Sequence, residues 1–268
     1  MIPGFTSVDM GPGIFAGFTA RAGGISTHPY ATLNLGPNVG DQPQAVANNR
    51  RIVAQAVGRP IAYAEQIHSD EVLVLDDDSP WYGSETPPIA VGKADGLVTA
   101  NSRLGLGVLV ADCVPILLAS DAAIAIAHAG RRGIELGVIA QVVAQLRGLS
   151  GDGEVRAAIG PAICGQCYEV PDQMQAEVCQ ISPEAFATTR WGTPGLDLPA
   201  AAAAQLAAAG AVVRYQSTVC TFTDESYYSH RRASATGETT GRQAGIIARQ
   251  PSDLPENNND VSLSAWRP

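Results

Sequence analysis

Histidine and cysteine are the side chains of this sequence best suited to metal chemistry, and histidine is scarce. The 268 residues include 4 histidines and 5 cysteines. Zinc prefers imidazole and thiolate ligands, and a catalytic zinc site takes three protein ligands and leaves one position for water. His68, Cys113 and His128 would form such an open site. They are too widely separated to match a compact zinc motif, so spacing alone equally allows a buried thiol and two hydrogen-bonded structural histidines.

Two of these residues follow apolar runs that are typical of strands. Residues 106–110 precede Cys113, and residues 123–127 precede His128. If these strands are parallel neighbours, their carboxyl ends meet at the edge of the sheet where α/β proteins bind ligands. His68 precedes another apolar run and must reach that edge from a different direction. Whether the three residues meet therefore depends on the order of the strands.

Two arginine-containing turns are candidate anion sites. Residues 130–133 read Gly-Arg-Arg-Gly and open a predicted helix, where exposed backbone N–H groups and the helix N-terminus both favour an anion. Residues 229–232 read Ser-His-Arg-Arg and are followed by Thr-Gly-Arg-Gln at 240–243. The alternative for each turn is an ordinary solvated arginine pair.

Cys164 and Cys167 have the C-x-x-C spacing of a redox pair or of half a zinc site. The sequence contains no second C-x-x-C, and this one does not open a helix after a first strand as a thioredoxin-like motif does. Structural thiols are therefore the favoured interpretation. A dinucleotide-binding fingerprint and a Walker A motif are both missing from the sequence.

The elements that must position these residues alternate irregularly along the chain. Predicted strands cover residues 72–75, 106–110, 123–127, 155–159, 211–215 and 244–248. Predicted helices cover residues 134–146 and 199–209, the second ending at Gly210. We expect an α/β (α+β) layered sandwich with a mixed β-sheet. Residues 1–249 are expected to form a single domain, and residues 250–268 a flexible C-terminal tail.

Composition limits the classes of partner. The formal net charge of -9 gives no basic surface for nucleic acid or an anionic membrane, although local arginines could still bind a small anion. The apolar span 104–130 is interrupted by Asp112, Asp121 and Pro115, and it reads as two buried strands and a connection. The first basic residue is Arg21, so the N-terminus lacks the basic region of a signal peptide. We expect a soluble cytoplasmic protein with reduced thiols, present as a monomer or a small homo-oligomer.

Twelve segments along the chain together closely resemble the laccase-domain family, also called YfiH-like, multicopper polyphenol oxidase or peptidoglycan editing factor. The matching segments are residues 17–26, 33–36, 40–41, 49–50, 66–69, 94–99, 111–116, 128–133, 159–161, 167–170, 231–232 and 240–242. Their shared order along nearly the whole chain makes coincidence a poor explanation.

The resemblance implies that His68, Cys113 and His128 bind Zn²⁺ in a single-domain α/β protein with layered sheets and helices. It also implies a purine nucleoside enzyme whose partners are a nucleoside and phosphate. The implied activities are phosphorolysis of adenosine, inosine, guanosine and methylthioadenosine, together with adenosine deamination. The sequence departs from the family at Arg131, where a tryptophan is common, and at His230, where an aromatic residue is common.

The candidate residues for this chemistry are acidic and basic. Phosphorolysis needs cations for phosphate, for which we expect Arg21, Arg231, Arg232 and Arg242. Deamination needs a proton shuttle near the zinc-bound water, and the H-x-E deaminase signature is absent. Asp112, Glu169 and Asp95 are candidates for the shuttle, with Asp112 favoured because it adjoins Cys113. Arg132 completes the set of candidate catalytic residues, which is Asp112, Arg132 and Glu169.

Two alternative functions remain at this point, and a third is excluded by the number of histidines. A zinc-bound water could equally serve a hydrolase that edits misassembled peptidoglycan precursors. A structural zinc in a non-catalytic protein would need a fourth ligand, and none is evident near the three. A multicopper oxidase needs about eight further imidazoles beyond a blue-copper centre, which 4 histidines cannot supply. Adventitious copper at the zinc site would give weak oxidation at most.

Overall fold

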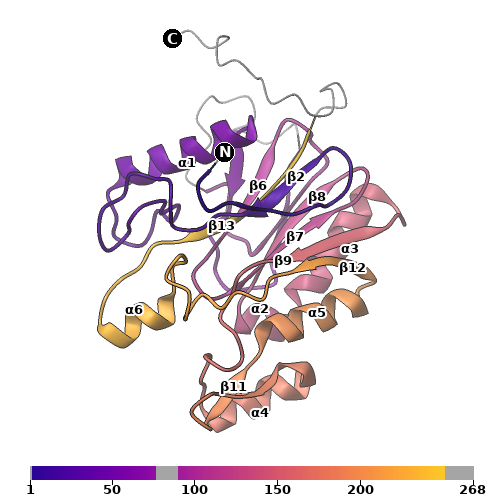
Figure 1. The fold of residues 1–268 in the computed structure, drawn as a ribbon. Coiled ribbons are helices and arrows are strands. Elements are labelled where there is room, and N and C mark those ends of the chain that lie inside the picture. Colours follow the sequence, from indigo (N-terminus) through magenta and orange to yellow (C-terminus); the bar gives the residue numbers. More distant parts are fainter. Residues whose placement is uncertain (1, 77–89, 251–268) are drawn as a thin grey trace.

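Two β-sheets packed face to face form the centre of the molecule (Figure 1). The structure is a computed structural model that describes residues 2–76 and 90–250. The five-stranded sheet has the order β1 (Thr6–Ser7), β2 (Ile14–Phe18), β13 (Gln243–Arg249), β6 (Gly105–Val110), β3 (Ile61–Tyr63). The six-stranded sheet has the order β12 (Ala211–Gln216), β9 (Val155–Ile159), β7 (Val114–Ala119), β8 (Ile124–Ala129), β5 (Gly96–Thr99), β4 (Val72–Val74).

Both sheets are mixed. In the five-stranded sheet, β13 is antiparallel to β2 and β6, and β3 is parallel to β6. In the six-stranded sheet, β7 is antiparallel to both of its neighbours, β8 and β9, whereas β12 is parallel to β9. The mixed α/β architecture expected from the sequence is therefore confirmed.

Side chains from the inner faces of the two sheets form the central core. Phe18 and Val108 of the five-stranded sheet belong to the same buried cluster as Leu117 and Ile126 of the six-stranded sheet. Alternate residues of β7 point the other way, and Ile116 belongs to the cluster on the outer face. This alternation explains why β7 is apolar at every position, since both of its faces are covered.

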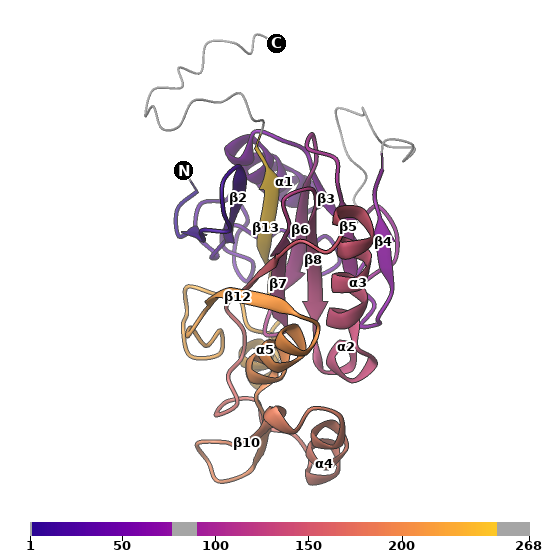
Figure 2. The same ribbon diagram turned by 90° about the vertical axis from the view of Figure 1, so that its right-hand side faces the viewer.

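Helices cover the outer faces. On the five-stranded sheet, Val53 of α1 (Pro43–Val57) packs in a cluster with Tyr63 and Ile246. The six-stranded sheet is covered by α2 (Arg131–Leu136), α3 (Val138–Ser150) and α5 (Leu198–Ala208), as Figure 2 shows. The remaining elements are α4 (Asp172–Ile181), a 3₁₀ turn (Pro183–Ala185), the hairpin of β10 (Phe186–Thr188) and β11 (Pro194–Leu196), and α6 (His230–Thr236).

All six predicted strands are confirmed, but two other sequence interpretations are wrong. The predicted helix 134–146 is two helices, because Gly137 has a left-handed φ of 84° that ends α2. The span 104–130 holds three strands and not two, since β7 begins directly after Cys113. Within the described residues, no helix is both long and apolar enough to cross a membrane. The single domain 1–249 stays a prediction, and residues 251–268 of the expected tail lie outside the described residues.

Candidate metal centre

His68, Cys113 and His128 meet at one end of the sandwich. Their ligand atoms all lie within 4.8 Å of one another. Cys113 Sγ is 3.9 Å from His68 Nε2, and the two imidazole centroids are 4.8 Å apart. His128 is buried, Cys113 is partly buried and His68 is exposed. The cluster therefore opens to solvent on the side of His68.

Antiparallel pairing brings Cys113 and His128 together. From the sequence we expected these strands to be parallel neighbours, but β6 and β8 belong to different sheets. Instead, residues 111–113 carry the chain from one sheet to the other, and β7 then pairs with β8, with Pro115 opposite His128 and Val114 opposite Ala129. The start of β7 thus lies beside the end of β8. The expected convergence is confirmed, and the expected reason for it is wrong.

A buried carboxylate, Asp95, fixes both histidines. It accepts hydrogen bonds from the backbone N–H groups of Ile67 (3.1 Å), His68 (3.0 Å) and Ser69 (2.7 Å), and from the Ser69 hydroxyl (2.8 Å). Its Oδ1 also lies 2.7 Å from His128 Nδ1. A proton on Nδ1 leaves Nε2 of His128 free to face the cluster, as is usual for metal-ligating histidines. Asp95 therefore acts as a positioning residue and is not placed as a proton shuttle.

The electrostatics of the cluster favour a charged cysteine. Burial raises the pKa of Cys113, but His128 and His68 together outweigh burial and lower this pKa to about 6. Burial lowers the pKa of His128, but Cys113 and Asp95 raise it to about 9. Burial raises the pKa of Asp95, but hydrogen bonds from His128 and Ser69 lower it to about 2. At neutral pH the metal-free cluster is therefore a thiolate–imidazolium pair supported by a carboxylate.

Gly130 keeps the space between the ligands empty. A Cβ atom at this position would lie 3.0 Å from His68 Cδ2 and 3.1 Å from Cys113 Sγ. Two imidazoles and one thiolate around such a space are the donor set of an open zinc-type site. The residues present therefore fit a metal ion.

Asp112 ties two loops to the cluster. Its backbone has a left-handed φ of 92°, which non-glycine residues rarely adopt. One carboxylate oxygen accepts a hydrogen bond from the Thr221 hydroxyl and the other from the Arg231 N–H, each at 2.6 Å. Its carbonyl accepts a hydrogen bond from the Ile163 N–H at 3.0 Å. These contacts give Asp112 a positioning role, and its predicted role in catalysis stays a prediction.

Arg231 and Arg242 are the two predicted phosphate ligands that lie near the cluster. The Arg231 guanidinium lies over the Tyr168 ring, 5.0 Å from its centroid. Burial lowers the pKa of Arg242, and nearby Cys113 and Asp112 oppose this shift. Arg242 directly precedes β13. The first residue of β13, Gln243, pairs with Val110, the last residue of β6, so Arg242 lies beside the link from β6 to β7.

The guanidinium groups of Arg21 and Arg232 donate to backbone carbonyls, as that of Arg242 also does to the carbonyls of Thr240 and Gly241. Arg21 donates to the carbonyls of Ala31 (2.8 Å) and Glu225 (3.3 Å). Arg232 donates to four backbone carbonyls in its own loop, those of Thr221, Phe222, Asp224 and Tyr227. Both arginines hold loops together in this conformation. Their predicted role as phosphate ligands is untested.

The other two predicted catalytic residues, Arg132 and Glu169, are both exposed. Arg132 lies in the first turn of α2, and Glu169 forms an isolated bridge with Gly195. Neither contacts the three candidate ligands through any hydrogen bond found among the described residues. Their roles stay predictions.

Tyr168 lies beside the cluster but was not predicted from the sequence. Burial raises the pKa of this phenol and Cys113 raises it further, whereas Arg131 and Arg231 oppose the shift, so all three side chains are close to it. Arg131 itself forms a 2.7 Å ion pair with Glu135. The signal was present, because Tyr168 lies in one of the segments that resemble the laccase-domain family, but nothing in its spacing assigned it a role.

Residues 15–250 match the model of a family described as multi-copper polyphenol oxidoreductase laccase. A purine nucleoside phosphorylase of Streptomyces coelicolor is 44% identical over 88% of this chain and 95% of its own length. One from Streptomyces griseus is 42% identical over 86% and 92%. Among solved structures, the hypothetical protein YfiH of Bacillus licheniformis superposes with a TM-score of 0.80 at 32% identity, covering 92% of this chain and 97% of that one. YlmD of Geobacillus stearothermophilus gives 0.78 at 34%, covering 90% and 93%.

Proposed function

Because the chain belongs to the multi-copper polyphenol oxidoreductase laccase family, we propose that it is a zinc-dependent purine nucleoside phosphorylase. The observation that carries the proposal is the cluster of His68, Cys113 and His128, with Arg231 and Arg242 close by. The names of the relatives at 42% and 44% identity support the reaction class.

Zinc is the proposed metal, with His68, Cys113 and His128 as its ligands. The mixed nitrogen and sulfur donor set and the space beside Gly130 support this choice. A bound zinc would supply a Lewis acid and lower the pKa of a water molecule in its open position. Asp95 holds His128 in the required tautomer, and its three backbone hydrogen bonds fix the loop that carries His68.

Phosphorolysis requires phosphate to attack C1′ of the ribose while the C–N bond to the purine breaks and its electrons move onto the base. Arg231 and Arg242 are the proposed phosphate ligands, since guanidinium groups bind phosphate through paired charge-assisted hydrogen bonds. Tyr168, held under Arg231, offers an aromatic face beside this position. The proposed substrates are adenosine, inosine, guanosine and methylthioadenosine.

Adenosine deamination is the proposed second activity of the same site. Water would replace the amino group at C6, giving inosine and ammonia. The exposure of His68 favours this activity, because it leaves the cluster open to both water and a base. Both oxygens of Asp112 already accept hydrogen bonds, so the exposed Glu169 is the better candidate for proton transfer.

The test is to incubate the zinc-loaded protein with adenosine, with and without phosphate, and to identify the products by chromatography and mass spectrometry. Adenine and ribose 1-phosphate are expected only with phosphate, and inosine is expected in both conditions. Cys113→Ala should abolish both reactions, whereas Cys179→Ala, outside the cluster, should not. A fully active Cys113→Ala protein would contradict the proposal. So would hydrolysis of muropeptides that carry a wrong amino acid, without any nucleoside product.

A further inference from the structure

A second group of sulfur atoms lies outside the site described above. The Sγ atoms of Cys164, Cys167 and Cys220 all lie within 4.8 Å of one another. The first two follow β9 and the third follows β12, and these strands are parallel neighbours that end together at Ile159 and Gln216. An isolated parallel bridge between Ala162 and Cys220 extends the pairing beyond the strands. Strand pairing therefore supplies the third cysteine that the C-x-x-C spacing lacks.

Polar contacts surround these sulfur atoms. The Cys164 N–H donates to Cys220 Sγ at 3.4 Å. Burial raises the pKa of Cys220, but hydrogen bonds from the backbone and side chain of Cys164 and from the backbone of Thr223 and Phe222 outweigh burial and lower it. The Arg190 guanidinium donates to Cys167 Sγ at 2.6 Å. Backbone N–H groups and a guanidinium both stabilise negative charge on sulfur.

Three thiolates with sulfur atoms within 4.8 Å of one another would repel each other strongly. A metal ion placed between the sulfurs would remove this repulsion, and the thiol protons would pass to the buffer as it binds. Three thiolates exceed the charge of a divalent ion by one, and Arg190 supplies a compensating positive charge. This charge balance favours a divalent ion over a monovalent one.

We propose that Cys164, Cys167 and Cys220 bind a thiophilic divalent metal ion of the zinc type, with a water molecule in its fourth position. Thiolate sulfur is a preferred ligand of zinc, and three sulfurs at these separations suit one tetrahedral ion. This site is separate from the cluster of His68, Cys113 and His128.

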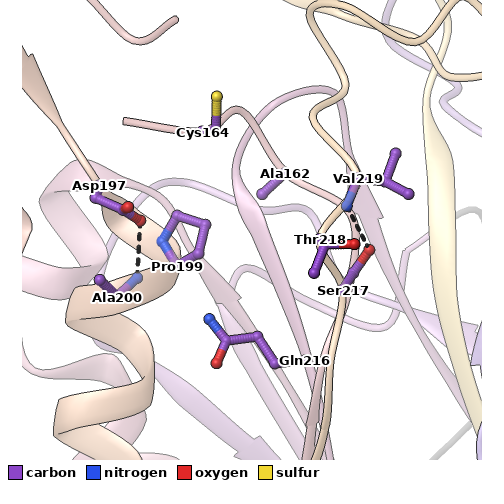
Figure 3. Close-up of a pocket in the computed structure, with 9 residues that line it drawn as sticks. All are labelled: Ala162, Cys164, Asp197, Pro199, Ala200, Gln216, Ser217, Thr218 and Val219. Carbon is purple, nitrogen blue, oxygen red and sulfur yellow. Dashed lines mark hydrogen bonds between the residues drawn. The ribbon is translucent and has the colours of Figure 1, made fainter. Parts of the chain in front are cut away.

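The neighbouring cavity, of about 370 Å³, is not the proposed metal position. Cys164 lies on its rim, and Figure 3 shows its sulfur pointing away from the other labelled residues of the lining. That direction agrees with the place of Cys164 in the three-cysteine cluster. The polar residues Gln216, Ser217 and Thr218 also line the cavity, and Figure 3 shows Ser217 and Thr218 across from Asp197 and Pro199.

A metal ion here would join the two loops that border the first site. Cys167 directly precedes Tyr168, whose ring lies under Arg231. Cys220 directly precedes Thr221, whose hydroxyl donates to Asp112. The ion would therefore have a structural role and would stabilise the positions of Tyr168 and Asp112 relative to Cys113.

The experiment measures zinc per folded chain in the wild type and four variants, one of them the double variant Cys113→Ala/Cys220→Ser, all purified under reducing conditions. The wild type and the matched control Cys179→Ser should each retain about two ions, one at each cluster. Cys220→Ser and Cys113→Ala should each retain about one ion, and the double variant should retain almost none. If the first site binds no zinc, the wild type retains one ion and Cys220→Ser loses it, so failure of the proposed function is distinguishable from failure of this proposal.

A spectroscopic measurement covers the case in which Cys220→Ser fails to fold. Cd²⁺ added to Cys113→Ala should give the strong thiolate-to-metal charge-transfer absorption of several sulfur ligands. In this variant the first site has no sulfur ligand, so the absorption would come from the three-cysteine cluster. Cys164→Ser in the same background should reduce this absorption. Zinc content and absorption that are unchanged in every cysteine variant would overturn the proposal. A disulfide between Cys164 and Cys220 or Cys167 in the reduced preparation, with no bound metal, would also overturn it.

Discussion

At the scale of single residues, Asp95 is the group on which the first site most depends. It has no exposed surface, and it joins the loop that carries His68 to the strand that carries His128. Its charge is retained because the hydrogen bonds from His128 and Ser69 outweigh the burial that would raise its pKa. One carboxylate thus holds the backbone of His68 and the side chain of His128, the two proposed histidine ligands.

Asp95→Asn should weaken metal binding with the fold retained. The amide removes the negative charge that holds the Nδ1 proton on His128, and losing such a partner costs about 10–100-fold in metal affinity. A competition titration against a chromophoric chelator measures this change. Asp70→Asn, on the same loop but without a contact to either histidine among those found, is the control and should leave the affinity unchanged. Equal affinities in the two variants would refute the role of Asp95.

Metal affinity at the first site should rise with pH between about 6 and about 9. Metal binds the neutral form of His128, whose pKa in the metal-free protein is raised to about 9, so binding below that pH must displace a proton. Cys113, with its pKa lowered to about 6, is already a thiolate in this range. One displaced proton corresponds to about 10-fold in affinity per pH unit. Titrations at several pH values check the slope, and a flat profile would contradict the assignment of these pKa values.

At the scale of elements, hydrophobic pattern predicted six of the thirteen strands in the described residues, but not how the chain turns between them. β7 was missed because Pro115 and Asp112 suggest a connection, and proline has no N–H for an interior ladder. In the structure Pro115 is near the start of β7, where its carbonyl accepts from the Gly160 N–H. The helix break at Gly137 was missed because the apolar residues on either side keep helical spacing.

Because the sequence does not show which strands pair, only part of each candidate site could be predicted from it. His68, Cys113 and His128 were identified by residue type and by family resemblance, since their meeting depends on the β7–β8 pairing that the sequence did not predict. Cys220 could not be joined to the C-x-x-C pair, because that contact depends on β9 and β12 being parallel neighbours. Long-range strand pairing carries the information that local patterns lack.

Gly130→Ala should impair the first site without disturbing α2. The backbone of Gly130, at φ -76° and ψ 174°, suits any residue, so alanine adds no backbone strain. Its Cβ would press on His68 and Cys113, and we expect about a 10-fold loss of metal affinity, in the range seen when ligands are displaced from their preferred orientation. Gly148→Ala in α3 is the matched control, since nothing lies within 4 Å of its Cβ. If both variants bind metal like the wild type, Gly130 does not shape the site.

At the scale of the whole molecule, the two sulfur-containing clusters lie where connections of both sheets meet. The link at residues 111–113 passes from the five-stranded to the six-stranded sheet and carries Cys113. Asp112 fastens this link to the loop that follows β12, which also carries Cys220. The chain as a whole is acidic, with a formal net charge of -9, yet Arg131, Arg231 and Arg242 gather near this end. Under the proposed function, Arg231 and Arg242 would attract phosphate locally despite the negative net charge of the chain.

Metal removal should lower the thermal stability of the whole domain. A ligand that binds only the folded chain, present at 100 times its dissociation constant, stabilises it by about 2.7 kcal/mol for each site. For a protein of this size that free energy corresponds to a rise in Tm of about 5–11 °C for each site. Chelator-treated protein should therefore melt at a lower temperature and recover when zinc is restored, as followed by calorimetry. The rise in Tm on adding zinc should be smaller in Cys113→Ala and in Cys220→Ser than in the wild type, and it should be absent in the double variant. A zinc-dependent rise that persists in the double variant would place the stabilising ion at neither cluster.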